Sequence, residues 1–345
     1  MKGIVMAGGF GTRLKPLTND LPKPLVPMAT RPIIDPIIEL LQKNSITELS
    51  VLLYFQPDLI SGHLGNGSSF GVNIKYIIPT VDLGTAGAVA YAMREAGDNS
   101  TTLVISGDVL TDIDLKKAIE FHKKRKSIAT IVLTRVENPL SFGIVITDTK
   151  GRIKKFLEKP GWGEVFSDTI NTGIYILESQ VLDCIPKDGE FDFSKDLFPA
   201  LLERKMPMFG YIAEGYWKDV GSLDEFRQAN MDILKGSVKF SIPGEKVKGR
   251  DIWAGHGAKI DFTSRFEGAL VVGANARIGA EVRIVNSVIG SNSVVEEGAT
   301  IIDSVVWDNV RIKRGASMQE AIVGGFTEVH EGAHLSEGSV VSDHC

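Results

Sequence analysis

A 17-residue repeat in the last quarter of the chain constrains the fold more than any other feature of the sequence. Successive apolar columns are six, six and five residues apart, so that one coil closes every 17 residues. Three apolar faces per coil predict a left-handed parallel β-helix with a triangular cross-section. An earlier coil at Ala254, Ile260 and Phe266 fits if one residue is inserted before Val272. The three columns are Val272, Ile289, Val306 and Val323; Ile278, Val295, Ile312 and Val329; and Ile284, Ile301, Met318 and Leu335.

The first two thirds of the chain alternate between apolar runs typical of buried strands and amphipathic segments typical of helices. This alternation predicts an α/β, Rossmann-like fold with a mostly parallel sheet covered on both faces. A hairpin-like insertion is expected at residues 142–157, and a glycine-rich linker separates the two parts. We therefore expect a first domain at 1–235, a linker at 236–251 and the β-helix at 252–345. The main strands are expected at 4–6, 49–55, 72–78, 102–106 and 128–133, and helices at 33–41, 86–96, 113–122, 194–204 and 222–235.

Composition narrows the class of protein. The 345 residues are 43% apolar and 23% charged, which is typical of soluble globular proteins with two domains. The net charge of −5 argues against nucleic-acid binding, so any phosphate site has to be locally positive. Two cysteines make no disulfide framework and suit a reducing compartment. Because we find no signal peptide and no long apolar run, we expect a cytoplasmic protein without membrane contact.

A glycine-rich loop follows the first predicted strand. It contains Gly8, Gly9 and Gly11, and it is followed by Arg13 and by Lys23, which stands between two prolines. Glycines let backbone N–H groups converge on phosphate oxygens at short range. The guanidinium of Arg13 offers a planar fork for phosphate, and Lys23 offers a compact charge. The loop therefore predicts a binding site for a polyphosphate.

Other glycine-rich loops fit the sequence less well. In a dinucleotide fingerprint the third glycine would fall at Leu14, and no acidic residue follows at the end of a second strand. These departures disfavour a nicotinamide-dependent dehydrogenase. The Gly-Lys-Ser/Thr of a Walker loop is absent. A purely structural turn would not account for Arg13 and Lys23 among so many prolines.

The run GGFGTRLKPLT, followed by PKPLVP, resembles the signature of the sugar nucleotidyltransferases, also called nucleotide-sugar pyrophosphorylases. The resemblance implies transfer of a nucleotidyl group from a nucleoside triphosphate to a sugar-1-phosphate, with release of pyrophosphate. It makes residues 1–235 the catalytic domain. The stretches LGTAGA, FLEKP and VFSDTINTGIYIL look most like mannose-1-phosphate guanylyltransferases, which implies GTP and mannose-1-phosphate as substrates. Glucose-1-phosphate with dTTP, UTP or ATP stays open.

Two aspartates are candidates for a metal site. Asp108 stands at the carboxyl end of a buried strand, where α/β sheets present ligands, and Asp219 stands in Trp-Lys-Asp-Val-Gly. Carboxylate oxygens suit Mg²⁺. Taken without the resemblance, the two residues are better explained as unrelated strand-end or capping aspartates. The resemblance implies that both hold Mg²⁺.

The resemblance also implies roles for individual residues. The catalytic residues would be Arg13, Lys23, Asp108, Lys159 and Asp219. Nucleotide contacts would come from Ala7, Gly8, Gly9, Gly11, Thr12, Arg13, Gly84, Thr85 and Gly107. Sugar-phosphate contacts would come from Lys23, Gly143, Glu158, Lys159, Asn171 and Thr172.

Some alternatives remain beside this interpretation. A non-catalytic regulatory or sensor subunit could share the fold, although such subunits usually lose the charged residues that are retained here. The basic run at residues 122–126 is expected to be a solvated helix end. The flat faces of the β-helix are expected to support a homo-oligomer.

Overall fold

The computed structural model describes residues 1–97, 99–158 and 167–345. They form two compact units, each built from separate stretches of the chain. The first unit comprises Met1–Gly9 and Ile37–Trp217, and the second comprises Phe10–Pro36 and Lys218–Cys345. These units group residues by their contacts and not by their order in the chain. The domain boundaries expected from the sequence, at 235 and 251, therefore remain a prediction.

The first unit is built on one large sheet with a parallel part and an antiparallel part. In the parallel part β1 pairs with β4 and β6, and β4 pairs with β5. The long strand β11 runs antiparallel to β6 and β8, and the hairpin β9–β10 continues the sheet beyond it. The α/β fold class and the expected hairpin are confirmed. The strands are β1 (Lys2–Met6), β4 (Glu48–Leu52), β5 (Asn73–Ile77), β6 (Thr102–Ser106), β8 (Ala129–Arg135), β9 (Gly143–Thr147), β10 (Ile153–Glu158), β11 (Thr169–Leu177) and β12 (Met208–Ile212).

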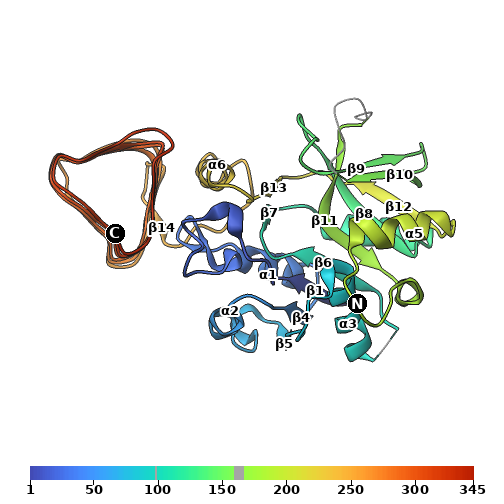
Figure 1. Cartoon of the computed structure of the whole chain (residues 1–345). Coiled ribbons are helices and arrows are strands. Elements are labelled where there is room, and N and C mark those ends of the chain that lie inside the picture. The colour runs from blue at the N-terminus through green and yellow to red at the C-terminus, as the bar shows by residue number, and fades with distance from the viewer. Residues whose placement is uncertain (98, 159–166) are drawn as a thin grey trace. The chain divides into compact units, whose positions relative to one another are not determined.

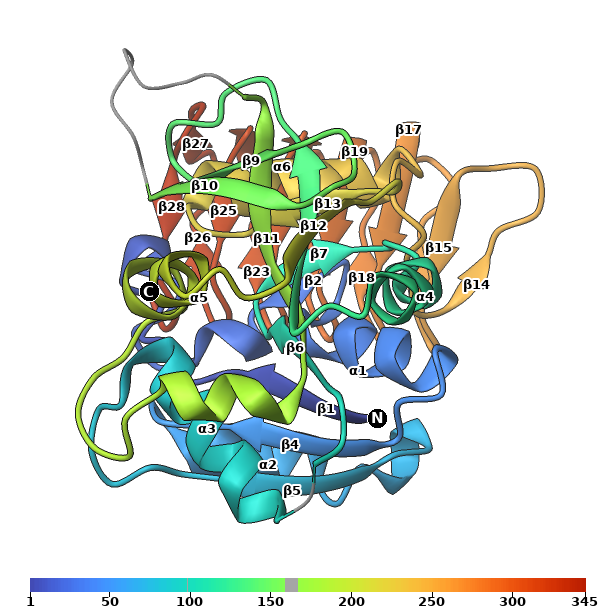
Figure 2. The ribbon, with the colours of Figure 1, turned by 90° about the vertical axis from the view of Figure 1, so that its right-hand side faces the viewer.

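Helices cover both faces of the parallel part of the sheet. Neighbouring residues of β1 point to opposite faces, so Gly3 and Ile4 show which helix lies on each. Ile4 belongs to the apolar cluster that contains Val89 and Met93 of α3, which lies across β1 and β4 in Figure 2. On the other face a Cβ at Gly3 would lie 3.7 Å from Leu41 of α1. The helices are α1 (Ile34–Lys43), α2 (Pro57–Leu64), α3 (Gly84–Ala96), α4 (Leu115–Arg125) and α5 (Phe198–Glu203).

The second unit combines the proline-rich segment Phe10–Pro36, the helix α6 (Leu223–Leu234) and the β-helix. The segment ends in a tight hairpin of β2 (Pro27–Met28) and β3 (Arg31–Pro32). The helix α6 packs against β2 and also against β17 and β19 of the β-helix. A short strand, β14 (Glu245–Lys246), lies in the expected linker and pairs with the first coil. The remaining short strands outside the β-helix are β7 (Val109–Thr111) and β13 (Trp217–Asp219).

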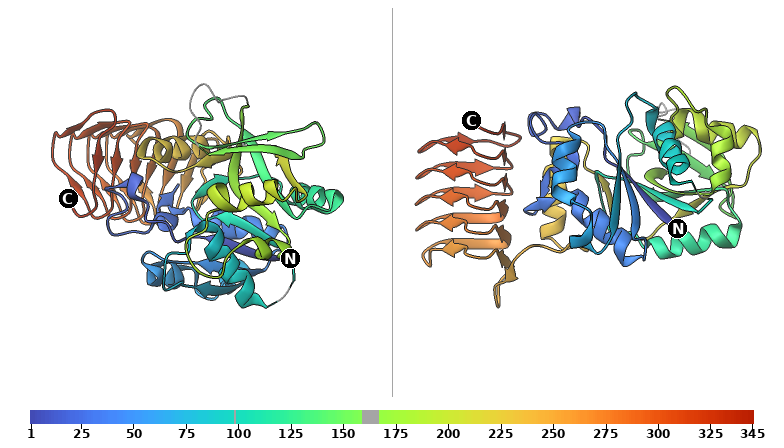
Figure 3. Two further views of the ribbon diagram at one scale, coloured as in Figure 1. Left: turned by 45° about the vertical axis from the view of Figure 1, so that its right-hand side comes forward. Right: turned by 90° about the horizontal axis from the view of Figure 1, so that it is seen from below.

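The β-helix matches the 17-residue repeat. Seen along its axis the coil is a triangle (Figure 1), and Figure 3 shows the coils stacked from the side. Parallel pairing joins each apolar column, for example Ile284 to Ile301 and Ile301 to Met318. The column residues are buried except for Leu335, which is partly buried. The extra residue of the first coil falls between Glu267 and Leu270, where the register shifts. The larger strands of the coils are β15 (Ile252–Ala254), β17 (Arg265–Val272), β19 (Arg283–Ile289), β21 (Thr300–Ile302) and β24 (Ser317–Gln319).

The two-residue strands complete the three faces of the β-helix. They are β16 (Lys259–Ile260), β18 (Arg277–Ile278), β20 (Val294–Val295), β22 (Val305–Val306), β23 (Arg311–Ile312), β25 (Ile322–Val323), β26 (Glu328–Val329), β27 (His334–Leu335) and β28 (Val340–Val341).

One corner of the β-helix carries a ladder of asparagines. Asn275, Asn292 and Asn309 have φ values of 57°, 57° and 60°, in the left-handed region that asparagine tolerates better than most residues. Their side chains form a chain of hydrogen bonds, each 3.3 Å long, from Asn275 to Asn292 and from Asn292 to Asn309. The sharp corner is therefore built by local backbone chemistry as well as by the apolar columns.

Two further expectations concern the whole chain. Neither Cys184 nor Cys345 forms a disulfide. In the part of the chain that the structure describes, no helix has both the length and the apolar character needed to cross a membrane.

Candidate active site

The loop at Gly11 folds back against Lys23. Gly11 has φ +62°, and a Cβ there would lie 3.0 Å from Cβ of Lys23 and 3.2 Å from Cγ2 of Thr18. The hydroxyl of Thr18 donates to the carbonyl oxygen of Gly11 (2.8 Å), which closes the loop. Glycine is thus required at position 11 both by the backbone conformation and by the close approach. Thr12, also predicted to contact nucleotide, begins the single 3₁₀ turn Thr12–Leu14 that follows.

Three of the predicted catalytic residues meet in the second unit. The ammonium of Lys23 lies 3.4 Å from Oδ1 of Asp219, and the guanidinium of Arg13 lies 3.6 Å from Oδ2. The side chain of Lys23 is 9% exposed, whereas that of Arg13 is 70% exposed. A buried ammonium next to an exposed guanidinium gives the local positive charge that an acidic protein needs to bind phosphate.

Gly221, which is not among the residues predicted for the site, makes room for this cluster. A Cβ at Gly221 would lie 2.7 Å from Oδ2 of Asp219 and 2.9 Å from Nη2 of Arg13. Any larger residue would therefore push the two charged groups apart. The signal was present in the sequence, because Gly221 follows Asp219 by two positions in Trp-Lys-Asp-Val-Gly.

In the first unit the predicted nucleotide contacts gather where β1 and β6 end. The amide of Gly107 donates to the carbonyl of Met6 (2.8 Å), and a Cβ at Gly107 would lie 3.2 Å from Cβ of Ala7. Gly8 lies against Tyr54, because a Cβ there would be 3.1 Å from Cβ of Tyr54. Glycines at these strand ends keep the backbones close together and accessible to a ligand.

Asp108 and Gly9 extend this strand-end group. Asp108 follows Gly107 directly and is partly exposed, and Gly9 is exposed, with no atom within 4 Å of the position that a Cβ would take. Asp108 belongs to the first unit and Asp219 to the second, so their shared binding of a metal remains a prediction. Among residues 1–97, 99–158 and 167–345 there is no cluster of three or more His, Cys, Asp or Glu suited to a metal ion.

The predicted base-binding loop is anchored to a distant part of the first unit. Gly84 has φ +64°, and a Cβ there would lie 2.8 Å from the backbone nitrogen of Phe191. The amide and the hydroxyl of Thr85 both donate to Oδ1 of Asp192, at 3.2 and 2.9 Å. Gly84 and Thr85 begin α3, so this loop presents a helix N-terminus, which favours negative groups.

The predicted sugar-binding residues lie on β9, β10 and β11. Gly143 pairs with Glu158 across the hairpin, and a Cβ at Gly143 would lie 3.0 Å from Oε2 of Glu158. The side-chain amide of Asn171 donates to the hydroxyl of Tyr175 (2.9 Å), and its oxygen accepts from the amide of Gly173 (3.0 Å). Burial raises the pKa of Tyr175, which keeps its hydroxyl neutral beside Asn171. Lys159, the remaining catalytic prediction, lies outside the described residues.

Thr172 was also predicted to contact the sugar phosphate, and this contact remains a prediction. Its side chain is buried, and its hydroxyl donates to the carbonyl of Val132 (2.8 Å). Its carbonyl oxygen accepts from the indole nitrogen of Trp217 (2.9 Å). The hydroxyl of Thr172 is therefore bonded within the core of the first unit.

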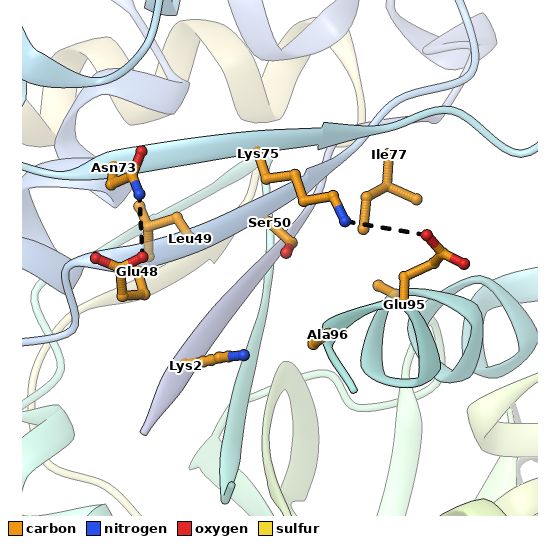
Figure 4. A pocket seen from close by; sticks show the side chains of 10 residues that line it. Lys2, Glu48, Leu49, Ser50, Asn73, Lys75, Ile77, Glu95 and Ala96 are labelled. Carbon is orange, nitrogen blue, oxygen red and sulfur yellow. Dashed lines mark hydrogen bonds and ion pairs between the residues drawn. The ribbon is translucent and has the colours of Figure 1, made fainter. Parts of the chain in front are cut away.

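A separate hollow of about 210 Å³ lies at the other end of the parallel strands. Figure 4 shows Lys75 reaching Glu95 (3.9 Å) and Asn73 reaching Glu48 (3.1 Å) along its wall. Lys2, Glu48 and Asn73 are the first residues of β1, β4 and β5. The hollow is thus at the amino ends of the strands, away from the glycines at the carboxyl ends, and it does not belong to the candidate active site.

The first unit has glycines at the carboxyl ends of an α/β sheet. In the second unit Arg13 and Lys23, from the loop segment that follows β1, pair with Asp219 at the end of β13. These features are those of a phosphate-binding transferase. The chain belongs to the nucleotidyl transferase family, whose model matches residues 2–236. A second model, described as the left-handed β-helix (LbH) domain of the EIF2B epsilon subunit, matches residues 250–345. The expected family and the left-handed β-helix are confirmed, and a nicotinamide-dependent dehydrogenase is excluded.

Curated relatives agree with this assignment. A UTP–glucose-1-phosphate uridylyltransferase of Synechocystis is 33% identical over 83% of this chain and 77% of its own length. A mannose-1-phosphate guanylyltransferase of Mycobacterium tuberculosis is 32% identical over 83% of this chain and 78% of its own. A mannose-1-phosphate guanyltransferase of Kluyveromyces lactis is 36% identical over 73% and 70%.

A solved structure shares the fold. It comes from Bacillus anthracis, is described as a glucose-1-phosphate thymidylyltransferase, and has 28% identity and a TM-score of 0.62 over 70% of this chain and 97% of its own. The chain is therefore an enzyme that transfers nucleotidyl groups to sugar-1-phosphates. Nucleotidyltransferases of this family generally use a divalent metal.

Proposed function

We propose that the chain makes GDP-mannose from GTP and mannose-1-phosphate, with release of pyrophosphate. Several relatives named for this reaction support the choice, including those of M. tuberculosis and K. lactis. An oxygen of the sugar phosphate would attack the α-phosphorus of GTP. The bond from that phosphorus to the bridging oxygen would break, and its electrons would leave with pyrophosphate. No covalent enzyme intermediate is needed, so positioning and charge neutralisation supply the catalysis.

The charged cluster would perform the central task of this reaction, which is to bring two polyanions together. The exposed guanidinium of Arg13 and the loop amides at Gly8, Gly9 and Gly11 would bind the β- and γ-phosphates. The buried ammonium of Lys23 would bind the sugar phosphate, and Lys159 would assist it. Without these charges the two phosphates repel each other at the distance that attack requires.

The first unit would supply the selectivity. Gly84 and Thr85 would meet the nucleobase at the start of α3, and Gly107 and Ala7 would let the nucleotide approach the strand ends. The carboxylate of Glu158 would accept hydrogen bonds from sugar hydroxyls. The side-chain amide of Asn171 would donate to sugar hydroxyls or accept from them. The internal hydrogen bonds of Asn171 to Tyr175 and Gly173 would hold its amide in one orientation.

The carboxylates of Asp108 and Asp219 suit Mg²⁺, since both offer hard oxygen ligands and both side chains are partly exposed. We propose that these two residues hold it. When bound, Mg²⁺ would neutralise phosphate charge and help to align the nucleotide. Asp219 would then have two roles, because it also orients Arg13 and Lys23.

The single observation that carries the proposal is the meeting of Arg13 and Lys23 at Asp219. Pyrophosphate release should be measured with Mg²⁺, GTP, UTP, dTTP and ATP, each with mannose-1-phosphate and glucose-1-phosphate. The highest kcat/KM is expected for GTP with mannose-1-phosphate. Lys23→Met should lower it by about 10²-fold, since it removes a charge next to the reacting phosphate, whereas Lys15→Met, which changes an exposed lysine, serves as the control.

Glucose-1-phosphate with UTP or dTTP is the second candidate. The Synechocystis uridylyltransferase covers as much of this chain as the M. tuberculosis enzyme does, at 33% against 32% identity. Preference for glucose-1-phosphate in the same panel would replace the first proposal with this one. Absence of turnover with every pair would reject both and favour a non-catalytic subunit.

A further inference from the structure

Asn230 is a fully buried polar residue that the reaction does not use directly. It lies in the middle of α6 and has no exposed surface. Its oxygen accepts a hydrogen bond from the amide of Ala29 (2.8 Å), and its nitrogen donates to the carbonyl of Phe226 (2.9 Å). The same nitrogen lies 3.5 Å from the sulfur of Met28. A buried amide of this kind is costly unless all of its partners are in place, so its geometry is tightly defined.

The partner of Asn230 is a turn with a strained backbone. Ala29 and Thr30, at the tip of the β2–β3 hairpin, have φ values of 44° and 73°. Neither residue is a glycine, and positive φ at an alanine or a threonine costs about 1 kcal/mol or more per residue. Such a turn persists where its surroundings over-determine it. The hydrogen bond from the Ala29 amide to Asn230 is one such constraint.

The turn is linked to Lys23 through two short backbone bridges. The amide of Val26 donates to the carbonyl of Lys23 (3.1 Å), and the amide of Ile33 donates to the carbonyl of Val26 (3.1 Å). The hairpin therefore closes directly on the 3₁₀ turn Lys23–Leu25. The side chain of Lys23 is almost buried, so it has little freedom to change its conformation. A shift of this backbone would therefore also shift the ammonium.

The other half of the ion pair is tied to the same helix. Lys218, next to Asp219, lies 3.0 Å from Asp232 and 3.6 Å from Glu225, both on α6. The helix in turn contacts the β-helix through Phe226, whose ring is 6.2 Å from that of Trp307, and through Arg227, which lies 2.8 Å from Glu320. The second unit thus connects the β-helix, α6 and the Lys23–Asp219 pair by direct contacts.

We propose that Asn230 is a positioning residue for the sugar phosphate, and that it acts by holding the Met28–Arg31 turn and through it the ammonium of Lys23. This inference rests on the proposed function, in which Lys23 binds the phosphate of the sugar substrate. Asn230 would make no contact with substrate. It would convert the rigidity of α6, packed on the β-helix, into a defined position for one catalytic charge.

The test is the variant Asn230→Leu, which keeps the number and branching of the side-chain heavy atoms and removes both hydrogen bonds. KM for mannose-1-phosphate is expected to rise about tenfold while KM for GTP changes less than twofold, because only the lysine that binds the sugar phosphate is displaced. A merely structural role would reduce the amount of active enzyme, which lowers the apparent kcat and leaves both KM values unchanged. Ile233→Val, a buried change on the same helix, is the matched packing control.

A double variant shows whether Asn230 acts through Lys23 or in another way. In the Lys23→Met variant, Asn230→Leu should raise KM for mannose-1-phosphate no further, since the group on which it acts is gone. An equal rise in both backgrounds, or no rise in either, overturns the inference. If Asn230→Leu yields no soluble enzyme, Asn230→Ala is measured by the same criteria.

Hydrogen–deuterium exchange gives a readout that needs no turnover. Peptides covering residues 23–33 are expected to exchange at least tenfold faster in Asn230→Leu than in the wild type, while peptides from the coils at 270–312 stay unchanged. If the wild-type enzyme turns over no substrate pair, the proposed function fails and this comparison alone decides on Asn230. Unchanged exchange at residues 23–33 would overturn the inference in either case.

Discussion

At the scale of single residues, Gly221 is required because Arg13 and Asp219 approach it so closely. In Gly221→Ala the new Cβ would lie under 3 Å from both charged groups, so the cluster has to open. We expect kcat/KM to fall by at least about tenfold, with a small change in thermal stability. Pyrophosphate release and thermal unfolding measure the two effects.

Gly62→Ala is the matched control for this substitution. Gly62 lies within α2, and a Cβ there would meet no atom within 4 Å. Alanine in a helix interior is favoured over glycine by about 1 kcal/mol, so the control should be equally active and slightly more stable. A Gly221→Ala enzyme with wild-type kcat/KM would show that the cluster tolerates the extra carbon.

Asp108 is the residue on which the metal prediction can be decided. Asp108→Asn keeps the size of the side chain and removes its charge, so Mg²⁺-dependent turnover should be abolished while the fold is preserved. Activity across a Mg²⁺ titration and circular dichroism test the two halves of this statement. Near-normal turnover at ordinary Mg²⁺ concentrations would remove Asp108 from the metal site.

His122 corrects the expectation that the whole basic run at 122–126 is solvated. Its imidazole is buried, with Nε2 2.9 Å from Glu178 and Nδ1 2.8 Å from the hydroxyl of Thr130. Burial lowers the pKa of His122, and Glu178 only partly opposes this shift. The other four residues of the run are exposed, as expected. The residue types alone did not predict which member of a charged run turns inward.

This buried histidine makes stability depend on pH in a defined direction. Below the unfolded-state pKa of about 6.5 the unfolded chain binds a proton that the folded state takes up only at lower pH. Stability is therefore lost as the pH falls from about 7 towards the lowered pKa, by at most about 1.4 kcal/mol per pH unit. Urea unfolding of wild type and His122→Gln between pH 7.5 and 5 should show a steeper loss for wild type. Parallel curves would contradict the assignment.

The candidate site was partly predictable for a physical reason. Gly11, Arg13 and Lys23 lie close together in the sequence, and phosphate chemistry explains why such residues occur together. Asp219, which is 196 residues from Lys23, was assigned through the resemblance. Asn230 carried no such signal, because an asparagine within a helix is ordinary until its partner, 201 residues away, is known. Long-range hydrogen bonds of this kind are set by tertiary packing.

At the scale of elements, the corner asparagines of the β-helix allow a sharp test. Asn292 has φ 57° and bonds to Asn275 and Asn309. Asn292→Ala should cost about 1 kcal/mol or more, since alanine is strained in the left-handed region. Asn292→Gly loses the ladder but not the backbone fit, so it should be less destabilised than the alanine variant. Chemical denaturation ranks the two, and equal losses would place the stabilisation in the ladder alone.

Periodicity explains which elements could be predicted. The coils could be predicted because one spacing repeats in three apolar columns. Each coil pairs only with the coil before it and the coil after it, so the order of pairing is also known. The strand β11 could not be placed in the same way, since its antiparallel pairing with β6 joins residues about 70 apart in the sequence, such as Ile105 and Ile174. Apolar runs indicate a strand without giving its direction or its neighbours.

At the scale of the whole molecule, the β-helix has two candidate roles that make opposite predictions. We expect it to support a homo-oligomer, which light scattering would report as a mass above the 37.5 kDa of one chain. It also contacts α6 within the second unit, through Trp307 and Glu320. If assembly were its only role, a chain ending at Gly249 would be a smaller, active enzyme with unchanged KM values.

The contacts of α6 indicate that the β-helix also supports this helix, so a chain without the β-helix should have altered KM values. Removing residues 250–345 uncovers Phe226, which is fully buried, and takes away the partner of Arg227. Exposing a buried phenylalanine costs about 2 kcal/mol or more, and the helix that loses this support also holds the Met28–Arg31 turn. We therefore expect the shortened chain to show a KM for the sugar phosphate raised at least as far as in Asn230→Leu. Wild-type KM values in a soluble, shortened chain would restrict the β-helix to assembly, because α6 would then hold Lys23 without it.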